Sequence, residues 1–316
     1  MVKVLIVQPI AEEGVKLLED QGYTVKQLAD VSIDNLKKEV VDSDAILVRT
    51  GELSREVIAA AKSLKVIARH GAGVDNIDLK AATEHGVQVT NTPIANNISV
   101  AEHTIGLMVA LAKQMRKADL ALREGRFEVR NIYIDVELSD KILGVIGLGK
   151  IGQQVAIKAA RGFDMKVLGY DPFVTQTEVN TLIEVTDDWE RVFKEADFIS
   201  LNLPLTEQTR DMIGKKEFAM MKQTAFLINC ARGQIVKEED LIEALERGEI
   251  AGAGLDVYAT EPPAKDNLLF QLENTIVTPH MAAHSYESMV KMACHAAQGI
   301  IEVLNKQEPT WPVNRI

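Results

Sequence analysis

Three polar side chains, Arg232, Glu261 and His280, each follow a predicted strand in the last third of the sequence. A guanidinium can bind a carboxylate through two hydrogen bonds and polarise the adjacent carbonyl group. An imidazole can donate a proton to that carbonyl oxygen, and a neighbouring carboxylate orients the imidazole and favours its charged form. Together these residue types suit a hydride transfer between a 2-hydroxy acid and its 2-keto acid. Taken singly, each has a structural alternative: a surface ion pair, a solvated loop acid and a buried structural histidine.

A glycine-rich turn follows the apolar run at 142–146 and precedes a predicted helix. Its first glycine permits a tight turn, its second lets the backbone approach a pyrophosphate, and its third lets the helix pack close to the sheet. The helix N-terminus offers N–H groups to phosphates. The cofactor-binding residues predicted here are Gly147, Gly149, Lys150, Ile151 and Gly152.

An acidic residue at the expected distance strengthens this interpretation. Asp171 ends a second predicted strand, at 166–170, where its carboxylate can bind both hydroxyls of a ribose and repel a 2′-phosphate. The sequence therefore predicts NAD as the cofactor, in preference to NADP. The alternative is an ordinary tight turn between a strand and a helix.

The bulk composition excludes several classes of protein. A chain of 316 residues with 47% hydrophobic and 26% charged residues is typical of a globular protein with two domains. A net charge of −11 argues against binding to nucleic acid or to an anionic membrane. Cys230 and Cys294 predict no disulfide, and the six histidines have no metal-binding spacing, so no metal is expected. Without a recognisable leader or membrane span, the predicted location is the cytoplasm.

Short apolar runs alternate with amphipathic segments along most of the chain, which predicts an α/β protein with parallel sheets. A first series of strands is expected at 2–7, 45–48, 65–68 and 87–90, and a second at 142–146, 166–170, 198–203, 225–229, 254–257 and 275–277.

Two long helices connect these series. One is expected from about 99 to 124, and another at 286–304 precedes an extended tail that returns to the first domain. The prediction is two Rossmann-like or flavodoxin-like domains with the active site in the cleft between them. The substrate-binding domain comprises 1–98 plus 288–316, and the NAD-binding domain comprises 99–287.

Motifs along nearly the whole chain resemble the D-isomer-specific 2-hydroxyacid dehydrogenases, a family that includes 3-phosphoglycerate dehydrogenases and glyoxylate/hydroxypyruvate reductases. The motifs are GAGVDNID at 71–78, NTP at 91–93, AEHT at 101–104, GLGKIG at 147–152, YDP at 170–172, LPLTEQT at 203–209, NCARG at 229–233, GLDVYATEPP at 254–263 and TPH at 278–280.

The resemblance implies a role for each matching residue. Arg232 would bind the substrate carboxylate and carbonyl, Glu261 would pair with His280, and His280 would be the acid and base. Asp256 would contact the nicotinamide amide. The other residues that the resemblance implies as cofactor contacts are Leu203, Pro204, Cys230 and Ala231. The resemblance also implies that the main chain of the loop Gly71, Ala72 and Gly73 would bind the substrate carboxylate. Family members are usually dimers, and the helix near 99–124 is where their subunits usually meet.

The identity of the substrate depends on further cations. Arg49 and Arg69 end strands of the first series, and Arg130 resembles a basic position in 3-phosphoglycerate dehydrogenases. These arginines suit a phosphate or a second acid group, although Arg69 and Arg130 could instead form ion pairs between domains. His284 departs from the small residue that relatives commonly have after the histidine, and it either points away or narrows the pocket.

We therefore expect an NAD-dependent enzyme, a homodimer acting on a small anionic 2-hydroxy or 2-keto acid, most simply a 3-phosphoglycerate dehydrogenase of serine biosynthesis. One alternative is a different enzyme of the same kind, either a hydroxypyruvate/glyoxylate reductase or another D-2-hydroxyacid dehydrogenase. The other alternative is an NAD(H)-sensing protein similar to the family's corepressors. Turnover discriminates the last from the others, because a sensor binds NADH yet reduces keto acids poorly.

Overall fold

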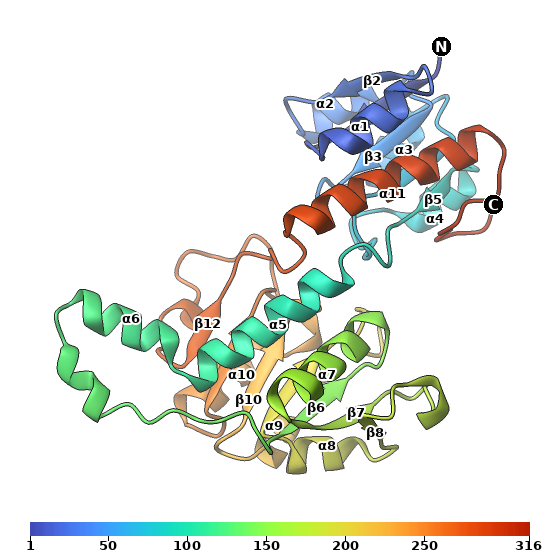
Figure 1. Ribbon diagram of the computed structural model, residues 1–316. Coiled ribbons are helices and arrows are strands. Elements are labelled where there is room, and N and C mark those ends of the chain that lie inside the picture. The colour runs from blue at the N-terminus through green and yellow to red at the C-terminus, as the bar shows by residue number, and fades with distance from the viewer. The chain divides into compact units, whose positions relative to one another are not determined.

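The computed structural model describes residues 1–316, and its contacts divide the chain into two compact units. Unit 1 comprises Met1–Asn97 and Ala283–Ile316, and unit 2 comprises Ile98–Ala282. The boundaries expected from the sequence were 98/99 and 287/288. Each unit contains its own parallel sheet, covered by helices on both faces (Figure 1).

The sheet of unit 1 has five parallel strands in the order β2-β1-β3-β4-β5. This order is that of flavodoxin-like folds. The strands are β1 (Lys3–Ile6), β2 (Thr24–Gln27), β3 (Ala45–Val48), β4 (Val66–Arg69) and β5 (Gln88–Thr90).

Two separate apolar clusters cover the two faces of this sheet. One contains Leu18 of α1 and Ile300 of α11, and the other contains side chains of the remaining three helices, such as Leu36 and Val57. Because both faces are covered, the strands are apolar almost without interruption, which explains their clear signal in the sequence. The helices are α1 (Glu12–Glu19), α2 (Ile33–Glu39), α3 (Arg55–Ala60), α4 (Leu79–Glu84) and α11 (Tyr286–Leu304).

The sheet of unit 2 has seven parallel strands in the order β12-β11-β10-β9-β6-β7-β8. The chain reverses its direction of sheet growth between β6 and β9, and in such sheets ligands bind beyond the carboxyl ends of the strands at this reversal. The strands are β6 (Ile142–Ile146), β7 (Lys166–Tyr170), β8 (Ile183–Val185), β9 (Phe198–Leu201), β10 (Phe226–Asn229), β11 (Gly252–Leu255) and β12 (Thr275–Val277).

Helices again cover both faces of this sheet. One face packs against α5 and α7 through residues such as Met108 and Val155, and the other against α8, α9 and α10 through Phe193, Phe218 and Leu241. No helix of either unit is long and apolar enough to cross a membrane. The helices are α5 (Asn97–Ala112), α6 (Met115–Arg123), α7 (Lys150–Phe163), α8 (Trp189–Glu195), α9 (Lys215–Met220) and α10 (Glu238–Glu246).

Two strands at sheet edges, β2 and β8, lie outside the strands predicted from the sequence. β2 is largely exposed and β8 has only three residues, so neither has the apolar run that marks a central strand. β11 begins and ends two residues earlier than expected, which places Asp256 immediately after the strand.

The single long helix expected from about 99 to 124 is wrong. The chain forms α5 and α6, separated by Lys113 and by Gln114, whose φ of 47° is left-handed and cannot continue a helix. The Gln114 side chain donates to the carbonyl of Ile134, 2.8 Å away, which helps hold this turn. No glycine or proline marks the break in the sequence. Figure 1 shows α6 and the chain after it projecting from the rest of unit 2.

The C-terminal tail docks beside β5 of unit 1, as the extended sequence predicted. Pro312 pairs antiparallel with Thr90, and Val313 donates its N–H to the Val89 carbonyl. The Asn314 side chain accepts from the Val89 N–H at 2.7 Å and donates to the Val87 carbonyl at 2.9 Å. The tail therefore satisfies an otherwise open sheet edge.

His70 directly follows β4 and is 3% exposed, and its Nε2 has no hydrogen-bond partner. Burial, with smaller contributions from the charges of Arg49 and Arg69, lowers its pKa from 6.5 to about 4. The unfolded chain therefore takes up a proton near pH 6.5, whereas the folded unit 1 resists it until about pH 4. The contribution of His70 to stability is present above pH 6.5 and is lost as the pH falls through this window.

Replacing His70 by Gln should remove this dependence on pH. Between about pH 7.5 and pH 5, the unfolding free energy of unit 1 should fall by about 2 kcal/mol more in the native protein than in the variant. The measurement is urea unfolding followed by Trp311 fluorescence in a Trp189→Phe background, because Trp311 lies in unit 1 and Trp189 in unit 2. Equal losses in the two proteins would show that His70 does not control the acid stability of unit 1.

Candidate active site in unit 2

The glycine turn after β6 has the geometry that each of its glycines was expected to provide. Gly147 has a φ of +93°, and a Cβ at Gly152 would lie 1.9 Å from the Gly147 carbonyl oxygen. A Cβ at Gly149 would meet nothing within 4 Å, so the space beside the turn is open. Gly149 is the N-cap of α7, and no side chain caps the N–H groups of Lys150 and Ile151 in the first turn. The turn therefore fits a pyrophosphate at the N-terminus of α7.

Asp171 lies directly after β7, beside this turn. Its carboxylate accepts the backbone N–H of Leu148 at 2.9 Å and that of Phe173 at 2.9 Å. Each oxygen keeps a further acceptor site, as binding to the hydroxyls of a ribose requires. Leu203 and Pro204 follow β9, the strand on the other side of the reversal, and Thr209 donates to the Pro204 carbonyl at 2.7 Å.

The turn that carries Arg232 follows β10 and is held by Asn229. The Asn229 side chain accepts from the Ala231 N–H at 3.0 Å and donates to the Arg232 carbonyl at 2.9 Å. The Arg232 guanidinium donates to the Ala231 carbonyl at 2.7 Å. Burial raises the pKa of the neighbouring Cys230 thiol to about 12, and the charge of Asp256 adds to the effect. This thiol is therefore neutral and serves as a packing group.

Glu261 and His280 form a close polar pair of the site. Glu261 Oε2 lies 2.6 Å from His280 Nδ1, and Glu261 Oε1 accepts from the Tyr258 N–H at 3.1 Å. Burial acts to raise the pKa of the Glu261 carboxyl, but the bonds from His280 and Tyr258 and the charge of Arg232 outweigh it and lower this pKa. An ionised carboxylate only accepts, so His280 Nδ1 carries a hydrogen and Nε2 remains for a reacting group.

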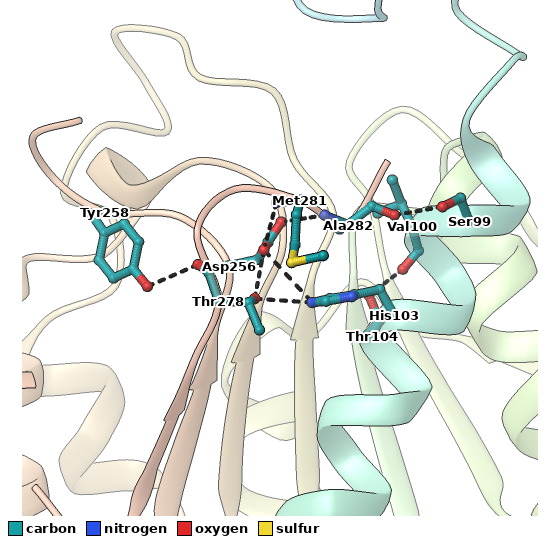
Figure 2. Close-up of polar contacts among 9 residues, drawn as sticks. All are labelled: Ser99, Val100, His103, Thr104, Asp256, Tyr258, Thr278, Met281 and Ala282. Atoms are coloured by element: carbon teal, nitrogen blue, oxygen red, sulfur yellow. Dashed lines mark hydrogen bonds and ion pairs between the residues drawn. The ribbon is translucent and has the colours of Figure 1, made fainter. Parts of the chain in front are cut away.

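The Asp256 carboxylate holds the loop that carries His280 (Figure 2). It accepts from the Thr278 hydroxyl at 2.5 Å, from the Met281 N–H at 2.9 Å and from the Ala282 N–H at 2.8 Å. His280 lies between these contacts with a left-handed φ of 49°. These contacts of Asp256 were not anticipated from the sequence. The available signal was the position of Asp256 and Thr278 at the carboxyl ends of strands that proved to be neighbours, β11 and β12.

The remaining predicted site residues lie elsewhere. In unit 1, the Arg69 side chain donates to Asn76 Oδ1 and to the His70 carbonyl, and Arg49 donates to the Pro9 carbonyl at 2.7 Å. The loop Gly71, Ala72 and Gly73 is tied to Thr92 and Asn91, which contact the backbone of Gly71 and of Ala72.

Arg130 lies in unit 2, in the short helix η1 (Phe127–Asn131), with its guanidinium 5.4 Å from the centre of the Phe127 ring. Arg130 lines a pocket formed by residues between Lys113 and Asp135, in the projecting part of the chain, and neither Glu261 nor His280 lines it.

Residues 105–282 match the family model for the NAD-binding domain of D-isomer specific 2-hydroxyacid dehydrogenases. The chain belongs to this family. Unit 2 is accordingly its NAD-binding domain, and the turn after β6, the open space at Gly149 and the free acceptor sites of Asp171 fit that cofactor.

Individual relatives resemble most of the chain. It is 44% identical, over 96% of its length, to a D-3-phosphoglycerate dehydrogenase of Methanocaldococcus jannaschii, and spans 58% of that protein. It is 38% identical, over 96% of its length, to a hydroxypyruvate reductase of Thermotoga maritima, and spans 98% of that protein. The structure of the TT0316 protein from Thermus thermophilus matches with a TM-score of 0.91 at 32% identity, over 99% of this chain and 100% of that one. The chain thus spans 50–58% of the length of several phosphoglycerate dehydrogenases that it matches.

The charge of Glu261 should control the pH range of 2-keto acid reduction. Glu261→Gln keeps the size of the side chain but removes the anion beside His280, so the charged imidazole loses its partner. The high-pH limb of the kcat/KM profile should move to lower pH by about one unit or more.

The measurement is NADH oxidation between about pH 5 and pH 9, with Glu238→Gln as the matched control. Glu238 accepts from the Ala259 N–H and from Asn267 in the same region, without contacting His280. An unchanged profile in Glu261→Gln would show that Glu261 does not support the titrating group.

Proposed function

We propose that the protein is an NAD-dependent D-2-hydroxyacid dehydrogenase whose reacting groups are Arg232, Glu261 and His280. The observation that carries this proposal is the 2.6 Å pair between Glu261 and His280 Nδ1, with the charge of Arg232 acting on Glu261. This arrangement engages His280 Nδ1 and leaves His280 Nε2 to meet a substrate. Reduction of a 2-keto acid requires a hydrogen-bond donor for the carboxylate, a proton source and an anion that orients it, and Arg232, His280 and Glu261 are residues of these three types.

In this mechanism Arg232 binds the substrate carboxylate and polarises the carbonyl at C2. NAD, when bound, supplies or accepts the hydride. His280 donates a proton from Nε2 to the substrate oxygen during reduction and removes it during oxidation, while Glu261 stabilises the charged imidazole. Asp256 keeps the His280 backbone in place through the loop contacts described above.

The groups that bind the cofactor are proposed on the same basis. The backbone of the turn Gly147–Gly152 would bind the pyrophosphate and Asp171 the ribose of the adenosine half. Leu203, Pro204, Cys230, Ala231 and Asp256 would surround the nicotinamide half. Position 171 is an aspartate, which would bind the ribose hydroxyls, and not a basic residue that would bind a 2′-phosphate, so NAD is favoured over NADP.

For the substrate we propose 3-phosphoglycerate and its keto acid. Relatives with 37–44% identity over nearly all of this chain are named D-3-phosphoglycerate dehydrogenases, which supports this choice. Arg49, Arg69, Arg130 and the Gly71–Gly73 backbone are proposed substrate contacts on sequence grounds alone. A second candidate is hydroxypyruvate, because a relative of which this chain covers 98% is named a hydroxypyruvate reductase.

The two candidates differ by one phosphate, so a direct comparison separates them. We expect kcat/KM for 3-phosphohydroxypyruvate to exceed that for hydroxypyruvate by about 100-fold, or about 2.7 kcal/mol of transition-state binding. NADH oxidation with both acids measures this ratio, and His280→Ala, which should lose turnover while still binding NADH, is the control. A preference for hydroxypyruvate would reject the phosphorylated substrate, and silence with every 2-keto acid would reject the enzymatic function.

We also propose a homodimer formed through the projecting segment 113–138, called here the arm. Its apolar side chains are unusually exposed: Phe127 is 62%, Ile132 67% and Ile134 85% exposed. A cavity of about 210 Å³ at the base of the arm adds further apolar surface from Leu111 and Phe226. Exposed apolar area of this kind on a single chain is typical of a protein interface. The cytoplasmic location and the place in serine biosynthesis remain predictions from the sequence.

Light scattering should give a mass twice the 34.8 kDa of the chain. The double variant Phe127→Asp, Ile134→Asp should give the single-chain mass, because two buried charges without partners oppose association. Phe173→Asp, at an aromatic residue that is 90% exposed but outside the arm, is the matched control and should leave the mass unchanged. A native single-chain mass, or a double variant that stays dimeric, would contradict an interface at the arm.

A further inference from the structure

The buried carboxylate of Asp256 has no lysine or arginine beside it. Its side chain is 1% exposed, and the nearest nitrogen of a basic side chain is Nε2 of His103, 3.6 Å away. His103 belongs to α5. Figure 2 shows its ring directed at Asp256 and Thr278.

The hydrogen bonds around Thr278 determine which atom of His103 carries a hydrogen. The Thr278 hydroxyl lies 2.5 Å from Asp256 Oδ1 and must donate to it, since an ionised carboxylate only accepts. A hydroxyl has one hydrogen, so Thr278 Oγ1 accepts from His103 Nε2, 3.0 Å away. His103 is therefore an Nε2–H donor, and its bond orients the Thr278 hydroxyl toward Asp256.

The same helix contacts the His280 loop at a second point. The Ser99 hydroxyl donates to the Ala282 carbonyl at 2.7 Å. Ser99 and His103 are four residues apart and so lie on the same face of α5. The loop is thus held on both sides of His280, at Thr278 and at Ala282, by two side chains of one helix as well as by Asp256.

We propose that His103 is a positioning residue for His280, a role that rests on the dehydrogenase function proposed above. Its Nε2–H keeps the Thr278 hydroxyl on Asp256, and this chain of bonds fixes the left-handed turn that presents His280 to Glu261. His103 contacts neither Glu261 nor the glycine turn. Its loss should therefore slow the reaction step more than it weakens NADH.

Two substitutions at His103 separate the hydrogen bond from simple packing. His103→Leu removes the donor and leaves an apolar side chain, whereas His103→Gln places an N–H donor at a similar distance from the backbone. Glu102→Gln is the matched control, because Glu102 is the preceding residue of α5 but pairs with Lys158 on the surface, 2.9 Å away.

The kinetic readout is kcat per NADH-binding site, with sites counted by fluorescence titration so that misfolded protein is excluded. We expect His103→Leu to lower kcat at least tenfold with KM and NADH affinity changed less than threefold or so, because small displacements of a reacting group have large effects on rate. His103→Gln should restore kcat to within about threefold of the native protein, and Glu102→Gln should match it. A native kcat in His103→Leu, or a Gln variant as slow as the Leu variant, would overturn the proposal.

A second readout does not depend on turnover. Hydrogen exchange of the peptide that contains Met281 and Ala282 should be faster in His103→Leu and close to native in His103→Gln, because both amides bond to Asp256. Unchanged exchange in His103→Leu overturns the positioning role even if activity falls. Faster exchange in a protein that reduces no 2-keto acid would uphold the role of His103 in the loop and reject the proposed reaction instead.

Discussion

The carboxylate of Asp256 is removed from solvent, and a buried charge is tolerated only where hydrogen bonds replace its water. Three of those bonds come from the loop that contains His280, two from backbone N–H groups and one from Thr278. A left-handed residue other than glycine costs about 1–2 kcal/mol. A hydrogen bond to a charged group contributes about 1.5–3 kcal/mol, so the set outweighs the strain at His280. The position of the proposed acid and base is thus a consequence of solvating a neighbouring anion.

The parallel sheet of unit 2 makes this arrangement possible. β10, β11 and β12 are adjacent, so the residues that follow them reach one edge even though 48 positions separate Arg232 from His280. The reversal between β6 and β9 places the glycine turn and Leu203 along the same edge, where nothing in the sheet obstructs a ligand. Because the strands are buried on both faces, their ends are fixed by the core, and only the loops remain free to differ in chemistry.

Much of this organisation was accessible from the sequence because it depends on local signals. Buried parallel strands are short apolar runs, and Gly147 and Gly152 occupy positions where a side chain would meet backbone atoms. The features that escaped prediction depend on tertiary context. Gln114 breaks a helix without a breaking residue, and β2 and β8 form only because a neighbouring strand offers its edge. The link between His103 and Asp256 escaped for the same reason: α5 lies about 150 residues from Asp256 in the sequence, and a histidine in an apolar helix carries no sign of its partner.

Chemistry and substrate choice have different physical origins in this protein. In the proposed mechanism, Arg232 and His280 bind a carboxylate and the adjacent oxygen, which every 2-hydroxy acid possesses, so this pair would not distinguish a phosphorylated acid from hydroxypyruvate. Discrimination requires groups that meet the substituent at C3. The candidates, Arg49, Arg69 and Arg130, lie outside the loops that hold the reacting residues, and Arg49 and Arg69 already donate to neighbouring groups of unit 1. A phosphate would have to compete with these neighbours for the guanidinium N–H groups. It would bind only if its hydrogen bonds to the guanidinium groups were more favourable than those that the neighbours lose. In the proposed function, the reacting residues would therefore determine the reaction, whereas selectivity would depend on how readily these arginines exchange their present partners for a phosphate.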